Sequence, residues 1–326
     1  MELSHLKGVI EEGNHLVPFL KSVLSDRNRF SEEEKQAAIS AAIIAMRDEG
    51  IVAVGDIANG IDTLKHRPDS GLHIHTFVES LGFTQENASA RFAYSENIYH
   101  QFAAQEEKDN LLRQSIVPHA PYSVSFSLFE LINNFDKNAI LSIHNQETLA
   151  EDDFYLTKTG AMLDLHRSLN IDASFFKASG KTSLQSYLPL IDSTHSMLFV
   201  HNTFTSLSDI DFLKNAGFDY VLCLCPNANL YIEKQLPPVT LFLQNELPIC
   251  LGTDSLSSNH QLSIWSEIQT LREHFPEISL ETMLTWATYN GAKALKMDHL
   301  IGSFEKGKKP GFVAINKNLE SAKKFF

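Results

Sequence analysis

The sequence is short of several features that would each assign a chain to a class of protein. Among 326 residues there are only three cysteines, and no two of them form a CxxC pair. Three cysteines cannot all pair with one another, which excludes a disulfide framework and favours a reducing, cytoplasmic location. No apolar run reaches the roughly 18 residues that a membrane span requires, and no basic start followed by an apolar stretch indicates a signal peptide.

Positive charge is also scarce. The chain has 27 lysines and arginines against 40 aspartates and glutamates, which gives a formal net charge of -13. Such a surface repels phosphate backbones, so no nucleic-acid partner is expected. No glycine-rich phosphate fingerprint follows the first apolar strand, and this argues against a dinucleotide-binding sheet. The expected partner is a small-molecule substrate, while a homo-oligomer is left open.

Short apolar runs alternate with amphipathic stretches almost throughout the chain. Seven of these runs predict buried strands, at 51–57, 71–80, 113–119, 139–144, 196–201, 220–225 and 248–254. One helix is predicted to begin at a capping box formed by Ser31 and Glu34 and to end at Gly50. Further helices are predicted over 86–112, 151–169, 208–216 and 279–296. Apolar rather than alternating strands are typical of a parallel sheet that is covered on both faces. The series therefore predicts an α/β fold, either a doubly wound sheet or a (β/α)8 barrel.

Polar residues at the strand ends decide between these two folds. His119, His144, His201 and Asp254 each lie at the C-terminal end of a different predicted strand. A barrel gathers its chemistry at that end, because the carboxyl ends of all its strands meet there. One polar strand end carries little weight, but four residues that can bind metal or transfer protons favour a TIM-barrel-like fold. With seven strands found, the count is one short of a complete barrel.

The segment SIHNQE places a histidine close to a carboxylate. His144 ends the apolar run AILSIH, and Glu147 follows three residues later, in the loop above the C-terminal ends of the strands. Neutral imidazole is a good ligand for Zn²⁺ or Fe²⁺, and a metal in such a site lowers the pKa of bound water to about 7. His144 would then hold a metal and Glu147 would carry the proton. The alternative is a packed histidine followed by a solvated glutamate, and the segment taken alone favours this alternative.

Two further strand ends carry candidate ligands. His201, in the segment FVHN, could bind the metal or contact the attacking water, although a lone histidine on an apolar strand is more often a satisfied core residue. Asp254, in the segment LGTDS, is costly to bury without a partner, and a metal is a natural partner. The alternative role for Asp254 is to cap the helix that follows residue 260, but a cap would be expected several residues later.

Two other pairs have the spacing of metal ligands but are predicted to be structural. His73 and His75 form an HxH pair, yet their strand continues to Glu79, which at ~3.3 Å per residue lies about 13 Å beyond His75. The pair is therefore expected near the wrong end of the barrel. Cys223 and Cys225 share one strand face, and we interpret them as packing because free cysteine is among the commonest core residues.

Five segments in a fixed order resemble the amidohydrolase superfamily: VPHAPYSVS, HNQE, FVHN, CPNANLYI and LGTDSLSSN. The nearest branch is similar to the cytosine deaminases and chlorohydrolases. Within it, HAPYS is similar to aminohydrolases that deaminate methylthioadenosine, S-adenosylhomocysteine and aminodeoxyfutalosine. The resemblance covers nearly the whole chain. It implies a (β/α)8 metal-dependent hydrolase fold, with residues 1–300 as the barrel and 301–326 as a tail that returns toward a small β-sandwich.

The resemblance also implies a role for each strand-end residue. His144 and Asp254 would bind one divalent metal, zinc before iron, and His201 would be a further ligand or would contact the attacking water. Glu147 would be the proton shuttle and a substrate contact, and Asp254 would also act as a base toward the water. His119 would contact the substrate. The implied reaction removes an amino group from a purine-like nucleoside or another heteroaromatic ring; the alternative is a non-catalytic barrel that binds a small molecule.

The first residues, MELSHLKG, resemble the segment that follows the first barrel strand in this family. That strand ends in an HxH pair that binds the metal, and Met1 stands where the residue after the second histidine would be. We therefore expect this chain to lack strand one and most of the flanking β-sandwich. Two or three protein ligands would be left, whereas a catalytic zinc usually has three, so weak metal binding and low activity are expected. The stretch before SEEEK, or a neighbouring chain, is expected to fill the gap.

Overall fold

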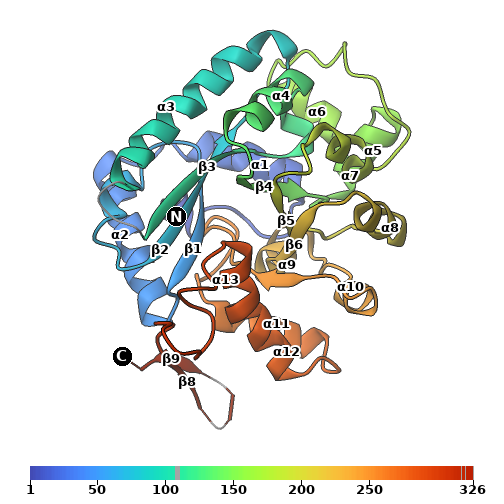
Figure 1. The fold of residues 1–326 in the computed structure, drawn as a ribbon. Helices are drawn as coiled ribbons and strands as arrows, with labels where there is room; N and C mark the ends of the chain where they lie inside the picture. Colours follow the sequence, from blue (N-terminus) through green and yellow to red (C-terminus); the bar gives the residue numbers. More distant parts are fainter. Residues whose placement is uncertain (107–110, 317, 320, 326) are drawn as a thin grey trace.

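Parallel strands surrounded by helices form the α/β architecture of the computed structural model, which describes residues 1–106, 111–316, 318–319 and 321–325 (Figure 1). The parallel strands are β1 (Ala53–Ala58), β2 (His73–Ser80), β3 (Leu112–Pro118), β4 (Ile140–Asn145), β5 (Ser196–His201), β6 (Asp219–Leu224) and β7 (Ile249–Leu251). All seven predicted strands are present, and each prediction begins within two residues of the observed start. Long apolar runs were sufficient to find them because both faces of these strands are covered.

Helices cover the outside of the strands (Figure 1). They are α1 (Leu16–Asp26), α2 (Glu32–Asp48), α3 (Ala88–Glu106), α4 (Phe126–Phe135), α5 (Leu149–Thr157), α6 (Ala161–Ser168), α7 (Ser183–Tyr187), α8 (Leu207–Asn215), α9 (Pro226–Glu233), α10 (Val239–Gln244), α11 (Ile264–His274), α12 (Leu280–Thr285) and α13 (Gly291–Ala294). A π-helical segment, η6 (Trp286–Asn290), joins the last two. None of the helices in the described ranges combines the length and apolarity needed to cross a membrane.

Two helix predictions need correction. The stretch 151–169 was expected to be one helix, but Lys158 and Gly160 have φ angles of 56° and 84°, and these left-handed residues separate α5 from α6. The helix expected over 86–112 corresponds to α3, while Leu112 already begins β3. Residues 107–110 of that prediction lie outside the described residues.

The strands form two parallel sheets that meet at β3 and β4. One sheet has the order β1-β2-β3 and the other the order β4-β5-β6-β7. The backbone N–H of His144 donates to the carbonyl oxygen of His119 at 2.9 Å, and the hydroxyl of Ser115 donates to the carbonyl oxygen of Ile140 at 2.7 Å. These bonds place β4 beside β3, so the strands follow one another in chain order as a TIM-barrel-like fold requires. Within the described residues, β1 pairs only with β2, and β7 pairs only with β6.

The stretch before residue 31 connects two distant parts of this arrangement. The ammonium group of Met1 lies 2.7 Å from Oδ1 of Asp56 in β1. The backbone N–H of Gly13 donates to the carbonyl oxygen of Tyr231 in α9 at 2.6 Å, and Leu6 is buried in the same apolar cluster as Tyr231. This segment therefore contacts β1 at one end and α9 at the other.

The last strands form a small antiparallel pair beside the C-terminus (Figure 1). They are β8 (Val313–Ile315) and β9 (Ala322–Lys324), and Ala314 pairs with Lys323. The largest apolar core lies elsewhere, between the strands and the helices, and contains Phe129, Phe199 and Phe242. The core fixes the positions of the strand ends and hence of the loops that follow them.

Candidate active site

Three of the predicted histidines form a row along neighbouring strand ends. His119 directly follows β3, His144 is the penultimate residue of β4, and His201 is the last residue of β5. The ring centroids of His119 and His144 are 4.9 Å apart, and those of His144 and His201 are 5.4 Å apart. Parallel pairing thus brings together residues that are far apart in the sequence.

Two carboxylates face the same row. Oε1 of Glu147 lies 3.5 Å from Nε2 of His201, and both side chains are buried. Asp254 follows β7, and its Oδ2 accepts a hydrogen bond from the hydroxyl of Ser258 at 2.5 Å. The charge of Asp254 acts on His144, Glu147 and His201. The structure therefore gathers the predicted histidines and both predicted carboxylates in one place.

The backbone of the site is left-handed at four residues other than glycine. The φ angles are 45° at Gln146, 76° at His201, 58° at Asn202 and 54° at Asp254. Such residues cost on the order of 1–3 kcal/mol each and persist only where the surrounding structure fixes them, most often at functional sites. Asp254 is not a helix cap, because the N-cap of α11 is Ser263. These left-handed residues instead change the direction of the chain at or shortly after the ends of β4, β5 and β7.

Hydrogen bonds from neighbouring elements hold two of these turns. The backbone N–H of Gln146 donates to Oε1 of Glu151 at 3.0 Å, and its side-chain amide donates to Asp209 at 3.0 Å. The side-chain amide of Asn145 donates to Oδ1 of Asn202, also at 3.0 Å. These bonds fix the direction in which the site residues leave the strand ends.

Burial and nearby charges set the proton affinities of the site. Burial raises the pKa of Glu147 to about 8, against the opposing effect of His144. Burial lowers the pKa of His201 to about 4, so this ring is neutral at physiological pH. Burial would also lower the pKa of His144, but the carboxylates of Glu79, Glu147 and Asp254 raise it above its usual value. The site therefore combines a carboxyl group that can hold a proton near neutral pH with a neutral imidazole beside it.

The tautomer of His201 depends on the side-chain amide of Asn229. The amide nitrogen lies 3.1 Å from Nδ1 of His201 and 2.8 Å from Oγ1 of Thr203, and in this orientation Nε2 of His201 carries the ring hydrogen. With the amide reversed, Nδ1 donates and Nε2 keeps a lone pair. Nε2 is buried and has no hydrogen-bond partner within the described part of the chain, while Oε1 of Glu147 lies 3.5 Å away. This geometry fits both roles expected for His201, a metal ligand and a contact to the attacking water.

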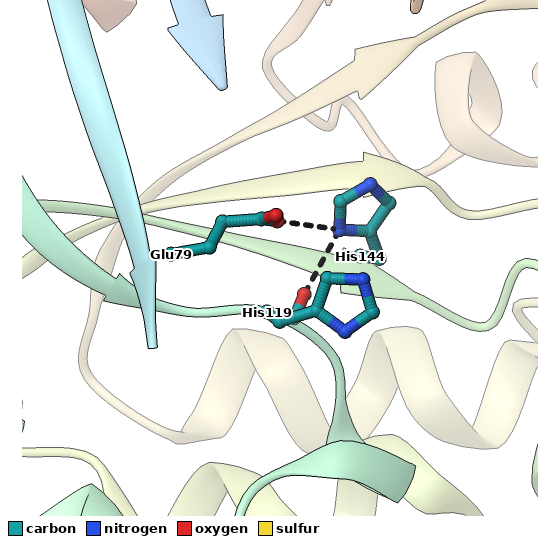
Figure 2. A group of neighbouring side chains, drawn as sticks. All are labelled: Glu79, His119 and His144. Atoms are coloured by element: carbon teal, nitrogen blue, oxygen red, sulfur yellow. Dashed lines mark hydrogen bonds and ion pairs between the residues drawn. The ribbon is translucent and has the colours of Figure 1, made fainter. Parts of the chain in front are cut away.

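The structure adds one site residue that the sequence interpretation missed. Glu79, near the end of β2, is buried, and its Oε1 lies 3.4 Å from Nδ1 of His144 (Figure 2). Within the described residues, Glu79, His119 and His144 form a group whose possible ligand atoms all lie within 4.8 Å of one another. A carboxylate near the end of an otherwise apolar strand is the signal that could have identified Glu79.

Neither of the two pairs predicted to be structural belongs to the row of histidines. His73 and His75 are at the start of β2, and Nε2 of His75 lies 3.0 Å from the hydroxyl of Ser115. Cys223 and Cys225 are free and buried in the main core. The histidine pair therefore lies at the end of its strand opposite to Glu79, and the cysteine pair packs in the core.

Comparison with known proteins decides which family the chain belongs to. The pattern of the amidohydrolase family matches residues 4–326, almost the entire sequence. The chain belongs to the amidohydrolase family. This confirms the superfamily predicted from the five ordered segments, and with it the expectation of an enzyme class that acts on C–N bonds.

Curated relatives of this amidohydrolase are deaminases. An adenosine deaminase of Helicobacter pylori is 29% identical over 317 residues, which cover 94% of this chain and 74% of that protein. A 5-methylthioadenosine/S-adenosylhomocysteine deaminase of Teredinibacter turnerae is 29% identical over 208 residues, which cover 62% of this chain and 42% of that protein. The chain thus spans about three quarters of the first relative and less than half of the second.

A solved structure agrees with the fold. The amidohydrolase superposes on Helicobacter pylori aminofutalosine deaminase in complex with methylthio-coformycin with a TM-score of 0.77 at 25% identity. The matched region covers 95% of this chain and 74% of the other. The predicted TIM-barrel-like hydrolase fold and the predicted deaminase relatives are therefore confirmed.

Proposed function

We propose that this amidohydrolase removes an amino group from a purine-like nucleoside by hydrolysis, with one divalent metal as cofactor. The observation that carries the proposal is the group of His144, His201, Glu147 and Asp254 at the carboxyl ends of the strands, in which His201 and Glu147 are buried. The names of the relatives, which are deaminases of adenosine-type compounds, support the substrate class. We further propose a barrel at residues 1–300, a tail at 301–326 and a cytoplasmic location.

The side chains of the site fit a divalent cation. A buried carboxylate is costly without positive charge nearby, and the negative charge of Asp254 adds to this cost for the buried Glu147. Nδ1 of His144 lies 2.9 Å from the carbonyl oxygen of His119, which leaves Nε2 of His144 with the lone pair that a metal needs. We take His144 and Asp254 as ligands, with zinc before iron, and because a catalytic zinc usually has three protein ligands we still expect this chain to bind the metal weakly. When bound, such a cation supplies a water molecule that is activated for attack near neutral pH.

The side chains of the protein carry the remaining steps. Glu147, whose pKa burial raises to about 8, takes a proton from the attacking water and delivers it to the leaving nitrogen. Water and the amino-substituted ring thereby give a ring carbonyl and ammonia. Asp254 serves as a further base toward the water, and the Nε2–H of His201 holds the water oxygen in place. His119 contacts the substrate at the mouth of the site.

Ammonia release together with metal analysis tests this proposal. The purified protein is assayed with adenosine, methylthioadenosine, S-adenosylhomocysteine and aminodeoxyfutalosine, and the variant Glu147→Gln serves as the inactive control. Ammonia above the control, with about one equivalent of zinc or iron per chain, supports the proposal. Nucleoside binding without ammonia release would instead support the alternative, a non-catalytic barrel that binds a small molecule.

A further inference from the structure

We propose that Glu79, anchored by Asn59, is a positioning residue that orients the ring of His144 and strengthens Nε2 of that ring as a metal ligand. The inference rests on the proposed function in one respect, the assignment of His144 as a ligand. Its physical basis is a set of contacts on the side of the ring that faces away from the proposed metal.

The hydrogen bonds of His144 determine which ring nitrogen carries the hydrogen. Nδ1 lies 2.9 Å from the carbonyl oxygen of His119, and a carbonyl oxygen can only accept. Nδ1 is therefore the donor, and Nε2 keeps the lone pair. The backbone N–H of His144 donates to the same carbonyl oxygen at 2.9 Å, so the ring is held against the end of the neighbouring strand β3.

Glu79 approaches the ring from the Nδ1 side. Figure 2 shows its carboxylate pointing at Nδ1 of His144, and the distance between Oε1 and Nδ1 is 3.4 Å. A carboxylate behind the N–H of a ligating histidine fixes the ring and raises the basicity of the opposite nitrogen. Because Nδ1 already donates to His119, a metal placed between Nδ1 and Glu79 would have to displace that bond. Glu79 is therefore better placed to act through His144 than to bind a metal itself.

Asn59 holds the carboxylate in this position. Its side-chain amide donates to Oε2 of Glu79 at 2.8 Å. The backbone N–H of Asn59 donates to Glu2 at 2.6 Å, and Glu2 accepts a further hydrogen bond from Arg27 at 2.9 Å. The result is a continuous polar chain from Arg27 through Glu2, Asn59 and Glu79 to His144. Glu2 and Glu79 are both only 4% exposed, so each carboxylate depends on these partners.

Substitutions at both ends of the Asn59–Glu79 contact distinguish a positioning role of Glu79 from direct metal binding by Glu79. Glu79→Ala removes the carboxylate, whereas Glu79→Gln keeps an oxygen that can accept from Nδ1, and Asn59 can turn its amide to accept from the new side chain. Asn59→Ala removes only the anchor. Ser95→Ala is the matched control, because the hydroxyl of Ser95 donates to the backbone carbonyl of Glu79 at 3.3 Å and so reports on packing of the strand end alone.

Two measurements are made on each variant. Affinity for Co²⁺ is measured by spectroscopic titration of the full chain. The electronic environment of the His144 ring is measured from its ¹⁵N chemical shifts in metal-free protein, at alkaline pH where the ring is neutral. The ring signals are assigned by their loss in His144→Gln.

The expected effects differ in size between the variants. Glu79→Ala should lower the affinity for Co²⁺ about 10–100-fold and move the ring ¹⁵N signals, while the carbonyl oxygen of His119 still keeps the hydrogen on Nδ1. Glu79→Gln keeps an acceptor but lacks the charge, so it should lose less affinity than Glu79→Ala, as should Asn59→Ala, and Ser95→Ala should retain nearly all of it. Unchanged affinity and unchanged ¹⁵N shifts in Glu79→Ala would overturn the proposal. A loss in Glu79→Gln as large as that in Glu79→Ala would also overturn it, because the retained acceptor would then contribute nothing to the position of the ring.

The variant His144→Gln separates this inference from the proposed function. If it binds Co²⁺ as tightly as the unchanged protein, His144 is not a ligand and that part of the proposed function fails. The ¹⁵N shifts of Glu79→Ala then still decide the positioning claim, since they are measured without metal: shifted signals support it, and unchanged signals overturn it.

Discussion

The two ends of the parallel strands both carry buried histidines, but the charges around these histidines have opposite sign. At the amino end of β2, burial lowers the pKa of His75 to about 3, and the cations of Arg67, Arg113 and Lys296 lower it further. At the carboxyl end of β4, His144 is half-buried, and the surrounding carboxylates raise its pKa. A histidine in this protein becomes a candidate for metal binding because of the carboxylates beside it, and HxH spacing is not sufficient.

Neither backbone strain nor concavity separates the two ends. Left-handed φ angles fall on Gln146, His201 and Asp254 at the carboxyl end, and on Asn138 before β4 and Glu246 before β7 at the amino end. A cavity of about 350 Å³ also lies at the amino end, lined in part by His75. The carboxylates beside the histidines are what distinguish the candidate active site.

The largest effect on activity is expected from a substitution of Glu147, at the carboxyl end of the strands. Glu147→Gln should lower turnover by about 10²-fold or more, because an amide cannot transfer the proton, while the fold and the metal content stay intact. Ammonia release gives the turnover, and elemental analysis gives the metal content. Near-normal turnover would remove Glu147 from the mechanism.

The matched control for Glu147 is Glu151→Gln. Burial raises the pKa of Glu151 to about 8 as well, but its oxygen accepts from the backbone of Gln146 and from the hydroxyl of Ser183 rather than facing a histidine. An amide oxygen can accept the same bonds, so turnover should change little. Equal losses in the two variants would mean that burial of a carboxylate, and not its position, is what matters.

The substitution Glu151→Gln also tests the raised pKa of Glu151 through the dependence of protein stability on pH. The folded pKa of Glu151 is about 8, while its ordinary value is 4.5, so the folded state keeps a proton that the unfolded state loses between these values. The contribution of Glu151 to stability therefore falls as pH rises from about 5 to about 8. Across that window, Glu151→Gln should gain roughly 3–4 kcal/mol relative to the unchanged protein. Urea unfolding at several pH values measures the difference, and a constant difference would contradict the assignment.

A smaller effect is expected at His119. His119→Ala should raise the Michaelis constant about tenfold, equivalent to about 1.4 kcal/mol, with unchanged metal content, because we assign it to substrate rather than to metal. Steady-state kinetics and elemental analysis check both parts. Ser123→Ala, which removes the hydroxyl 2.7 Å from Nδ1 of His119, should act in the same direction but more weakly. Loss of the metal in His119→Ala would show that its role is misassigned.

The smallest effect is expected at the amino end. His75→Leu removes the contact with the hydroxyl of Ser115 and should change the free energy of unfolding by about 1 kcal/mol, without altering turnover or metal content. Chemical denaturation and the ammonia assay measure these quantities. If this variant lost its metal, the contrast between the two strand ends would be wrong.

Much of the fold was readable from the sequence because its signals are local. An apolar run records burial on both faces of a strand, which is why all seven parallel strands could be located. The capping box of Ser31 and Glu34 is also observed at the start of α2, since both of its hydrogen bonds form within one turn. The break between α5 and α6 was missed although Gly160 marked it, because the flanking sequence continues a helical pattern.

The sequence by itself determined which strand ends carry His119, His144, His201 and Asp254, since each of them follows an apolar run. Only the tertiary structure decided that Glu79 approaches Nδ1 of His144, because these residues lie on β2 and β4 with β3 between them in chain order. The pKa of a buried group and the tautomer of a ring depend on charges and acceptors that are close in space. Distances of this kind are set by how strands pair, and no pattern within a single strand contains them.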